Sequence, residues 1–141
     1  MKAVLDTNVL ISAYLSSRGA PAEILRRWRS GEFTLVLSAL IILEFERVLR
    51  RPKFRAYLDP GALPLDELRA QAEIVLPVDV MAVLDDPSDD VIVGTALAGG
   101  ADVIVSGDDH LSRLDIYRGI KILTPRQFLD VLEMAPSDRV N

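Results

Sequence analysis

The segment KAVLDTNVLISAYLSS, residues 2–17, places a carboxylate between two apolar runs. Ala3, Val4 and Leu5 form a short continuous apolar run, which is typical of a buried strand, and a longer run with helical spacing follows Asn8. Asp6 lies at the junction. A buried strand gains no stability from a charge at its end, so Asp6 is either the N-cap of the next helix or a functional carboxylate.

The rest of the chain alternates short apolar runs with longer stretches of helical periodicity. We expect strands at 2–5, 34–37, 73–77, 103–105 and 120–123, and helices at 8–15, 21–30, 39–50, 65–71, 89–98 and 125–134. Strands separated by helices predict an α/β fold, a three-layer sandwich with a mostly parallel central sheet flanked by helices. We expect one domain over residues 1–135 and a flexible tail at 136–141.

Composition narrows the classes of function. The chain has no cysteine, which excludes disulfides and thiolate metal sites. It shows no signal peptide and no apolar run near the roughly 20 residues of a membrane span. We therefore expect a cytoplasmic protein that does not enter a membrane.

Charge is unevenly distributed along the chain. The net charge is −5, yet the window from Arg18 to Arg55 holds nine Lys or Arg and four acids, so it carries +5 and the remainder −10. Acids outside this window form adjacent pairs: Asp85-Asp86, Asp89-Asp90 and Asp108-Asp109. A basic segment can contact phosphates, and an acidic cluster can hold divalent cations that attract them.

Carboxylates recur where a parallel sheet places its ligand site, beyond the carboxyl ends of the strands. Asp6 follows the first strand, and Asp108 follows the strand at 103–105. Glu44 lies near the apolar side of the helix at 39–50, where we expect Leu40 and Ile41 to face the core and Glu46 to point elsewhere. Asp90 supplies a further carboxylate at the start of the helix at 89–98. We therefore expect four carboxylates in one cleft: Asp6, Glu44, Asp90 and Asp108.

Such a cluster favours a hard divalent cation, because several carboxylates brought together do not all stay ionised without one. We expect Mg²⁺ or Mn²⁺, which keep water ligands and bind substrate phosphates. The chemistry indicated is an in-line displacement at phosphorus, in which the ion activates a water and neutralises charge on the phosphoryl group.

Simpler structural roles compete for each residue taken singly. Asp89 and Asp90 can serve the helix dipole, and Asp108 and Asp109 can be turn residues. The only histidine, His110, is more simply a surface loop residue than a ligand. Short polar side chains beside the acids either orient the carboxylates by hydrogen bonds or form turns and caps: Thr7, Asn8 and Ser106. The cationic group at the end of the Glu44 helix is either a phosphate contact or solvated surface: Arg47, Arg50, Arg51 and Lys53.

Four segments resemble the PIN domain family: VLDTNVLIS at 4–12, SALIILEFERVLRRPKF at 38–54, DPSDDVIVGTALAGGADVIVSGDDHL at 86–111 and ILTPRQFL at 122–129. They are most similar to the branch of VapC-like toxins from toxin–antitoxin pairs. The resemblance implies a metal-dependent ribonuclease that cleaves single-stranded RNA. It further implies a cognate antitoxin protein as partner and a homodimer or higher homo-oligomer.

The resemblance also assigns residues. Asp6, Glu44 and Asp90 match the three near-invariant acids of the family, and Asp108 matches the fourth, more variable position. Thr7, Asn8 and Ser106 match the polar positions beside them. The chain reads GDDHL where this branch has GD-x-DL, so Asp108 and Asp109 are alternatives, of which we prefer Asp108. In the doublet, Asp90 fits the family spacing better than Asp89.

Two other functions remain as alternatives. A haloacid-dehalogenase-like phosphohydrolase also begins with an aspartate after the first strand, but it needs a second aspartate where this chain has Asn8. A non-catalytic regulatory module with an acidic pocket would need a lysine after its last strand, and Lys121 lies inside that strand. A PIN fold kept only as a scaffold would not need its four acids.

Overall fold

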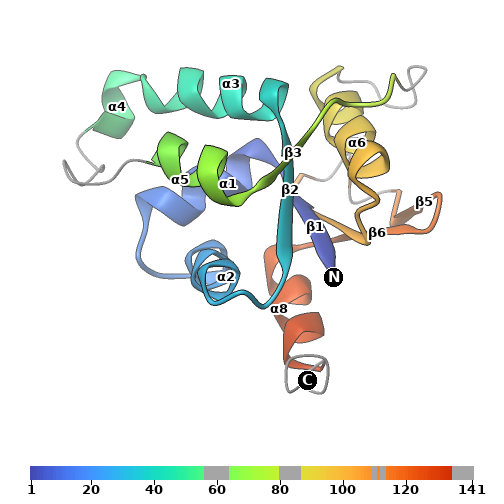
Figure 1. Ribbon diagram of the computed structural model, residues 1–141. Coiled ribbons are helices and arrows are strands. Elements are labelled where there is room, and N and C mark those ends of the chain that lie inside the picture. The colour runs from blue at the N-terminus through green and yellow to red at the C-terminus, as the bar shows by residue number, and fades with distance from the viewer. Residues whose placement is uncertain (56–63, 80–86, 109–110, 112–113, 135–141) are drawn as a thin grey trace.

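A six-stranded sheet of order β3-β2-β1-β4-β6-β5 runs through the centre of the protein (Figure 1). The computed structural model describes residues 1–55, 64–79, 87–108, 111 and 114–134. Its strands are β1 (Lys2–Leu5), β2 (Thr34–Ser38), β3 (Glu73–Val75), β4 (Val103–Val105), β5 (Ile116–Tyr117) and β6 (Ile120–Leu123). Every pairing is parallel except that of β5 with β6.

Helices cover both faces of this sheet. They are α1 (Thr7–Leu15), α2 (Ala20–Arg29), α3 (Ala39–Leu49), α4 (Pro52–Arg55), α5 (Pro64–Gln71), α6 (Pro87–Gly99) and α8 (Pro125–Glu133). Figure 1 shows α6 on one side of the central strands and α1, α2, α3 and α5 on the other. The predicted α/β sandwich with a mostly parallel sheet is confirmed.

The strand that opens the chain is central to the sheet. β1 pairs with β2 on one edge and with β4 on the other, with Ala3 opposite both Leu35 and Val103. Ala3, Val4 and Leu5 are completely buried. A strand buried on both faces has no position for a polar residue, which explains its continuous apolar run.

α6 lies unusually close to its neighbours at two glycines. A Cβ at Gly99 would lie 2.4 Å from Val36 Cγ1 in β2, and one at Gly94 would lie 2.2 Å from the carbonyl oxygen of Val78. The Val78 N–H donates to the Gly94 carbonyl at 3.0 Å. Only glycine permits these approaches, which fix α6 against the sheet.

Side-chain caps set where the helices begin. Asp6 accepts from the Val9 N–H at 2.8 Å at the start of α1, and Ser38 accepts from the Ile41 N–H at 3.3 Å at the start of α3. Thr124 and Gln127 form a capping box at α8. The caps at Ser38 and Thr124 follow the pattern expected from the sequence, since serine and threonine are favoured there.

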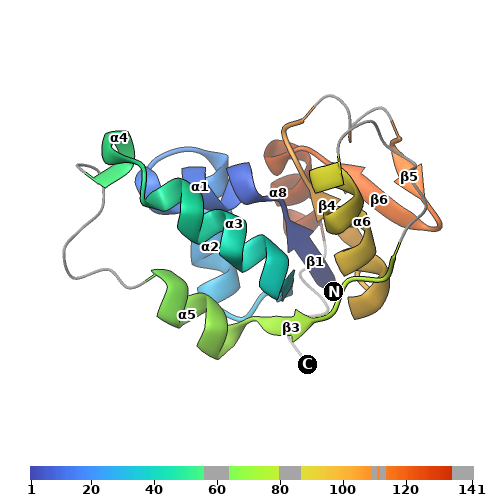
Figure 2. The ribbon, with the colours of Figure 1, turned by 90° about the horizontal axis from the view of Figure 1, so that it is seen from above.

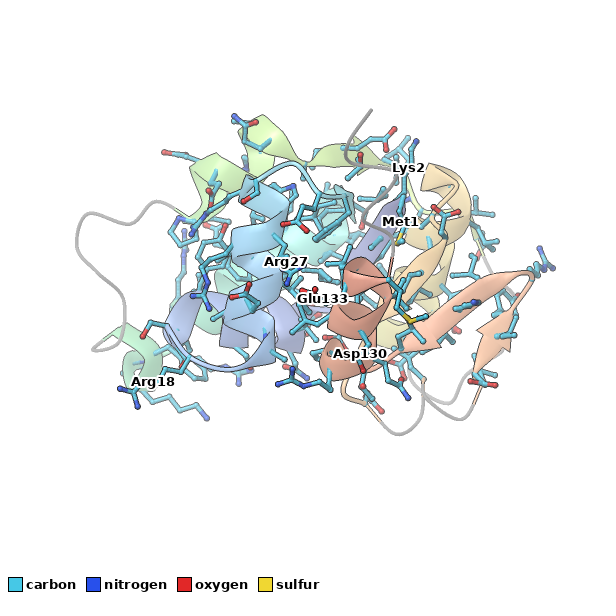
Figure 3. All side chains as sticks on the ribbon, turned by 90° about the horizontal axis from the view of Figure 1, so that it is seen from below. Met1, Lys2, Arg18, Arg27, Asp130 and Glu133 are labelled. Atoms are coloured by element: carbon cyan, nitrogen blue, oxygen red, sulfur yellow. The ribbon has the colours of Figure 1, made fainter. Side chains whose placement is uncertain are left out.

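An ion-pair group joins α2 to α8. Arg27 of α2 pairs with Glu133 of α8, and it also contacts Glu23 at 3.3 Å and Glu32 at 3.2 Å. Figure 3 shows Arg27 and Glu133 facing each other across these two helices. Part of the basic excess predicted for residues 18–55 is therefore neutralised within the fold.

Three features differ from the sequence predictions. α4 and the two-residue strand β5 were not predicted, because neither has enough residues to show a period. Leu40 was expected in the core but is 52% exposed, because α3 buries Ile41, Ile42, Phe45 and Leu49 instead. The predicted tail at 136–141 lies outside the described residues. Within those residues, no helix is long and apolar enough to cross a membrane.

Candidate active site

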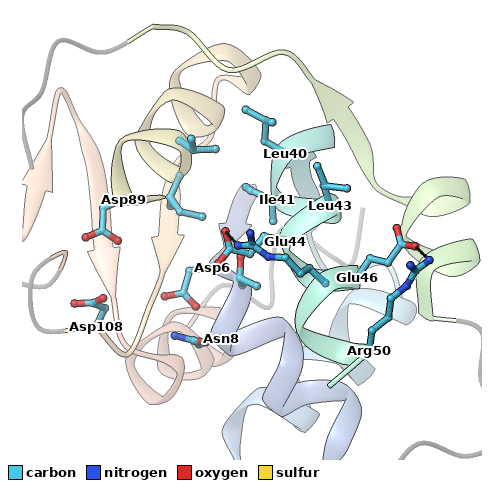
Figure 4. Close-up of a pocket in the computed structure, with 14 residues that line it drawn as sticks. Asp6, Asn8, Leu40, Ile41, Leu43, Glu44, Glu46, Arg50, Asp89 and Asp108 are labelled. Atoms are coloured by element: carbon cyan, nitrogen blue, oxygen red, sulfur yellow. Dashed lines mark hydrogen bonds and ion pairs between the residues drawn. The ribbon is translucent and has the colours of Figure 1, made fainter. Parts of the chain in front are cut away.

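A cleft of about 790 Å³ opens at the carboxyl ends of β1 and β4. Viewed from above, the carboxyl end of β1 lies between α3 and α6 (Figure 2). The walls of the cleft carry acidic residues from four segments: Asp6, Glu44, Asp89 and Asp108, with Glu46 further along α3. Figure 4 shows Asp6, Asp89 and Asp108 on one side of the cleft and the residues of α3 on the other.

Asp6 is at the bottom of this cleft and is only 6% exposed. Its Oδ1 accepts from the Val9 N–H, and its Oδ2 accepts from the Ser106 hydroxyl. Burial raises the pKa of the Asp6 carboxyl above its ordinary value, the two hydrogen bonds lower this pKa, and the nearby charge of Asp108 raises it. Asp6 is thus both a helix cap and a cleft residue.

Ser106 links the first acid to the last. Its hydroxyl is completely buried, donates to Asp6 and accepts from the Asp108 N–H at 3.0 Å. The serine therefore holds the Asp6 carboxylate and the backbone at Asp108 in one arrangement. The predicted neighbours Thr7 and Asn8 line the same cleft from the first turn of α1.

The doublet at the start of α6 differs from the prediction. Asp89 lines the cleft and is 6% exposed, whereas Asp90 is not among the lining residues. α6 begins at Pro87, so Asp89 shares a face with Ile92 and Ala96, both buried. Asp90 is one residue on, about 100° around the helix, and its buried Oδ1 has no hydrogen-bond partner among the described residues.

α3 forms the opposite wall. Glu44, Arg47 and Arg50 face the cleft, and the side chains of the two arginines are 72% and 73% exposed. Glu46, which was expected to point elsewhere, also lines the cleft; it pairs with Arg50 at 2.5 Å and with Arg69 at 3.9 Å. Leu40 and Leu43 add an exposed apolar surface to this wall.

The predicted cationic group is divided by the fold. Arg47 and Arg50 line the cleft, while Arg51 and Lys53 are exposed residues outside its lining, and the Lys53 ammonium lies 4.9 Å from the centre of the Phe54 ring. Asp109 and His110 lie outside the described residues. Of the two alternatives Asp108 and Asp109, Asp108 is a cleft residue.

The side chains of the cleft offer the type of ligand atom, carboxylate oxygen, that a hard divalent cation binds. Asp6, Asp89 and Asp108 offer carboxylate oxygens, and a cation would favour the ionised form of Asp6, which burial disfavours. Within the part of the chain that the structure describes, no three acidic side chains are close enough together to ligate one ion. The cleft therefore offers the ligand chemistry of a Mg²⁺ or Mn²⁺ site, without a formed set of three ligands among the described residues.

Sequence reasoning weighed both acids of the doublet and preferred Asp90 to Asp89, and it missed the apolar surface of Leu40 and Leu43. The start of α6 at Pro87 was the signal for Asp89, because proline favours the first turn of a helix and then places Asp89 with Ile92. No local signal marks the two leucines, because an exposed leucine has the same apolar pattern as a buried one.

A family model described as PIN domain matches residues 2–110 of this chain. The chain belongs to the PIN domain family. PIN domains are generally nucleases and generally use divalent metal ions. Membership favours the nuclease prediction over the haloacid-dehalogenase-like phosphohydrolase and the regulatory module.

Two further comparisons give one relative of similar sequence and one solved structure of similar fold. The chain is 29% identical over 143 residues to the uncharacterized protein MJ1680 of Methanocaldococcus jannaschii, covering 94% of this chain and 92% of that protein. Its fold is similar to a chain in the crystal structure of VapBC2 from Rickettsia felis bound to a DNA fragment from their promoter. That match has a TM-score of 0.56 and 14% identity, and it covers 86% of this chain and 97% of that chain.

Proposed function

We propose that this PIN domain is a Mg²⁺- or Mn²⁺-dependent endoribonuclease that cleaves single-stranded RNA as the toxin of a toxin–antitoxin pair. The observation that carries the proposal is the cleft in which Asp6, Asp89 and Asp108 face the wall of α3, which presents Glu44 together with the exposed Arg47 and Arg50. Carboxylates and arginines in one cleft suit a phosphodiester, which needs both a bound cation and contacts to its backbone charge.

The metal would be held by Asp6, Asp89 and Asp108, with Glu44 across the cleft. When bound, the ion would activate water and neutralise charge on the scissile phosphate. Asp6 contributes an oriented carboxylate because Val9 N–H and Ser106 fix both of its oxygens. Glu44 is 37% exposed in its side chain and is free to reach toward the ion, at the expense of its 3.6 Å contact with Arg47.

The remaining cleft residues would bind the RNA strand. Arg47 and Arg50 are exposed enough to donate to backbone phosphates on either side of the scissile bond. Leu40 and Leu43 offer an apolar surface to unstacked bases, which single strands present and duplexes do not. The wall of α3 therefore favours a single-stranded substrate.

The similarity in fold supports a proposal about partners. The solved complex with a related fold is named VapBC2, and a similar arrangement here would pair this chain with a cognate antitoxin in the cytoplasm. We further propose that the chain acts as a homodimer or higher homo-oligomer. Both proposals are tested by co-purification with the protein encoded by the neighbouring reading frame, followed by measurement of the mass in solution. A monomer that does not bind this protein would contradict them.

The enzymatic proposal is tested by incubating single-stranded RNA with Mn²⁺ and the parent protein, Asp6→Asn or Asp130→Asn. Asp130 is an exposed residue of α8 away from the cleft and serves as a matched control (Figure 3). We expect the parent and Asp130→Asn to cleave, and Asp6→Asn and the chelated parent to lose activity by about 100-fold or more. Cleavage in chelator, or full activity of Asp6→Asn, would overturn the proposal.

A further inference from the structure

A buried pair of hydroxyls lies between the two helical walls of the cleft. Ser38 ends β2 and caps α3, and Thr95 lies in α6; neither has any exposed surface. Thr95 Oγ1 is 3.0 Å from Ser38 Oγ and 2.7 Å from the Val91 carbonyl oxygen, and the Ile41 N–H donates to Ser38 Oγ at 3.3 Å. The hydrogen bonds therefore run without a break from α6 to α3.

Both ends of this chain of hydrogen bonds reach the cleft. Ile41, whose N–H Ser38 accepts, lines the cleft one turn before Glu44, and Val91, whose carbonyl Thr95 contacts, lines it two residues after Asp89. The Thr95–Ser38 hydrogen bond joins α6, which carries Asp89, to the residue that caps α3, which carries Glu44. Both helices also contact β2.

Apolar packing alone does not require these hydroxyls. The residues next to the pair along the chain, Leu37 and Ala96, are apolar and buried, and a valine has nearly the shape of Thr95. A buried hydroxyl that must be matched by a partner fixes one relative position of two elements, whereas apolar contacts tolerate sliding. The second tie of α6, from Val78 N–H to the Gly94 carbonyl, holds it to the segment after β3 and not to α3.

We infer that Thr95 and Ser38 are positioning residues that set the separation of Glu44 and Asp89, and thereby the affinity of the cleft for its divalent cation. The inference rests on the proposed function, since it concerns the same metal site. Neither residue lines the cleft, so neither touches the ion or the RNA. Losing a group that orients metal ligands typically weakens metal binding 10- to 100-fold.

The test measures Mn²⁺ affinity by titration calorimetry on chelator-treated parent, Thr95→Val and Thr95→Ser, together with melting temperature. We expect Thr95→Val to weaken Mn²⁺ binding about 10-fold and Thr95→Ser, which keeps the hydroxyl, to restore it. Leu129→Ala, in the buried face of α8 away from the cleft, controls for general loss of stability: it should lower the melting temperature and leave the Mn²⁺ affinity unchanged.

The outcomes separate the two proposals. If the parent binds no Mn²⁺, the proposed function fails and the positioning role fails with it. If the parent and Thr95→Val bind Mn²⁺ equally, only the positioning role is overturned, and the pair is a structural tie. Should Thr95→Val not fold, Ser38→Ala/Thr95→Val removes both hydroxyls, so that neither hydroxyl is left without the other, although the Ile41 N–H loses its cap, and this variant is held to the same 10-fold expectation.

Discussion

Asp6 has both of the roles that the sequence allowed as alternatives, helix cap and cleft carboxylate. It caps α1 through Val9 N–H, which is the structural role the sequence allowed, and it also lines the cleft with Asp89 and Asp108. Its second oxygen is held by Ser106, a residue 100 positions away in the chain. A cap alone needs no such partner, so this arrangement favours a functional carboxylate.

Asp6 should also make stability depend on pH in the metal-free protein. Burial raises the pKa of this carboxyl above 3.8, so the folded state holds its proton more tightly than the unfolded state does. The contribution of Asp6 to the free energy of unfolding is therefore greatest below the unfolded pKa and falls as pH rises through the folded pKa. Asp6→Asn removes this term, so its stability relative to the parent should improve between pH 4 and pH 7.

Urea unfolding of both proteins at the two pH values measures this difference. Groups that do not interact with Asp6 titrate alike in both proteins and cancel in the comparison, whereas the interaction with Asp108 is lost with the Asp6 charge and belongs to the measured difference. The opposite result is that Asp6→Asn loses stability relative to the parent as pH rises. It would show that the hydrogen bonds to the ionised Asp6 carboxylate stabilise it more than burial destabilises it.

The α3 wall divides four candidate cations into two pairs. Arg47 and Arg50 line the cleft, while Arg51 and Lys53 do not. We expect Arg47→Ala/Arg50→Ala to weaken binding of a single-stranded RNA and to reduce the slope of log affinity against log salt by about 0.7 per lost phosphate contact. Arg51→Ala/Lys53→Ala removes the same charge and should change the slope less. Equal effects of the two double variants, measured by fluorescence anisotropy, would assign the response to overall charge.

The position of α6 depends on its glycines. Gly94→Ala would bring a Cβ to 2.2 Å from the backbone oxygen of Val78, so one element must move. We expect a loss of about 1–3 kcal/mol in the free energy of unfolding, as for other overpacked sites. Gly107→Ala meets nothing within 4 Å and is the matched control in thermal or urea unfolding. A Gly94→Ala protein as stable as this control would mean that the close approach of α6 is not required.

Most of the elements could be predicted from the sequence because their signals are local. The apolar run of β1, the caps of α3 and α8 and the two glycines at the end of α6, Gly99 and Gly100, each act within a few residues. Which side of a helix faces the core or the cleft was harder to predict. Leu40, Glu46 and the choice between Asp89 and Asp90 each depended on a rotation of about 100°, which is set by packing against distant elements and not by neighbours in sequence.

Charge is organised across the protein as a whole. The cleft gathers carboxylates from the segments after β1 and β4 and from α6, and it gathers both carboxylates and arginines from α3. A cation that binds there stabilises the folded state in proportion to its affinity and concentration. At 100 times its dissociation constant, Mn²⁺ should add about 2.7 kcal/mol to the free energy of unfolding.

Thermal unfolding with and without Mn²⁺ measures this stabilisation. We expect a rise in melting temperature for the parent and for Asp130→Asn, and little or none for Asp89→Asn. A rise of equal size in all three proteins would place the bound ion away from the cleft.

The most direct test of a metal-nuclease centre in this cleft compares the two neighbours at the start of α6. Asp89→Asn and Asp90→Asn make the same chemical change one residue apart, and only Asp89 lines the cleft. After circular dichroism shows both to be folded, cleavage of single-stranded RNA in Mn²⁺ should fall by about 100-fold or more in Asp89→Asn and stay within a few-fold of the parent in Asp90→Asn. Loss of activity in Asp90→Asn with Asp89→Asn still active would contradict the assignment, as would parental activity in both.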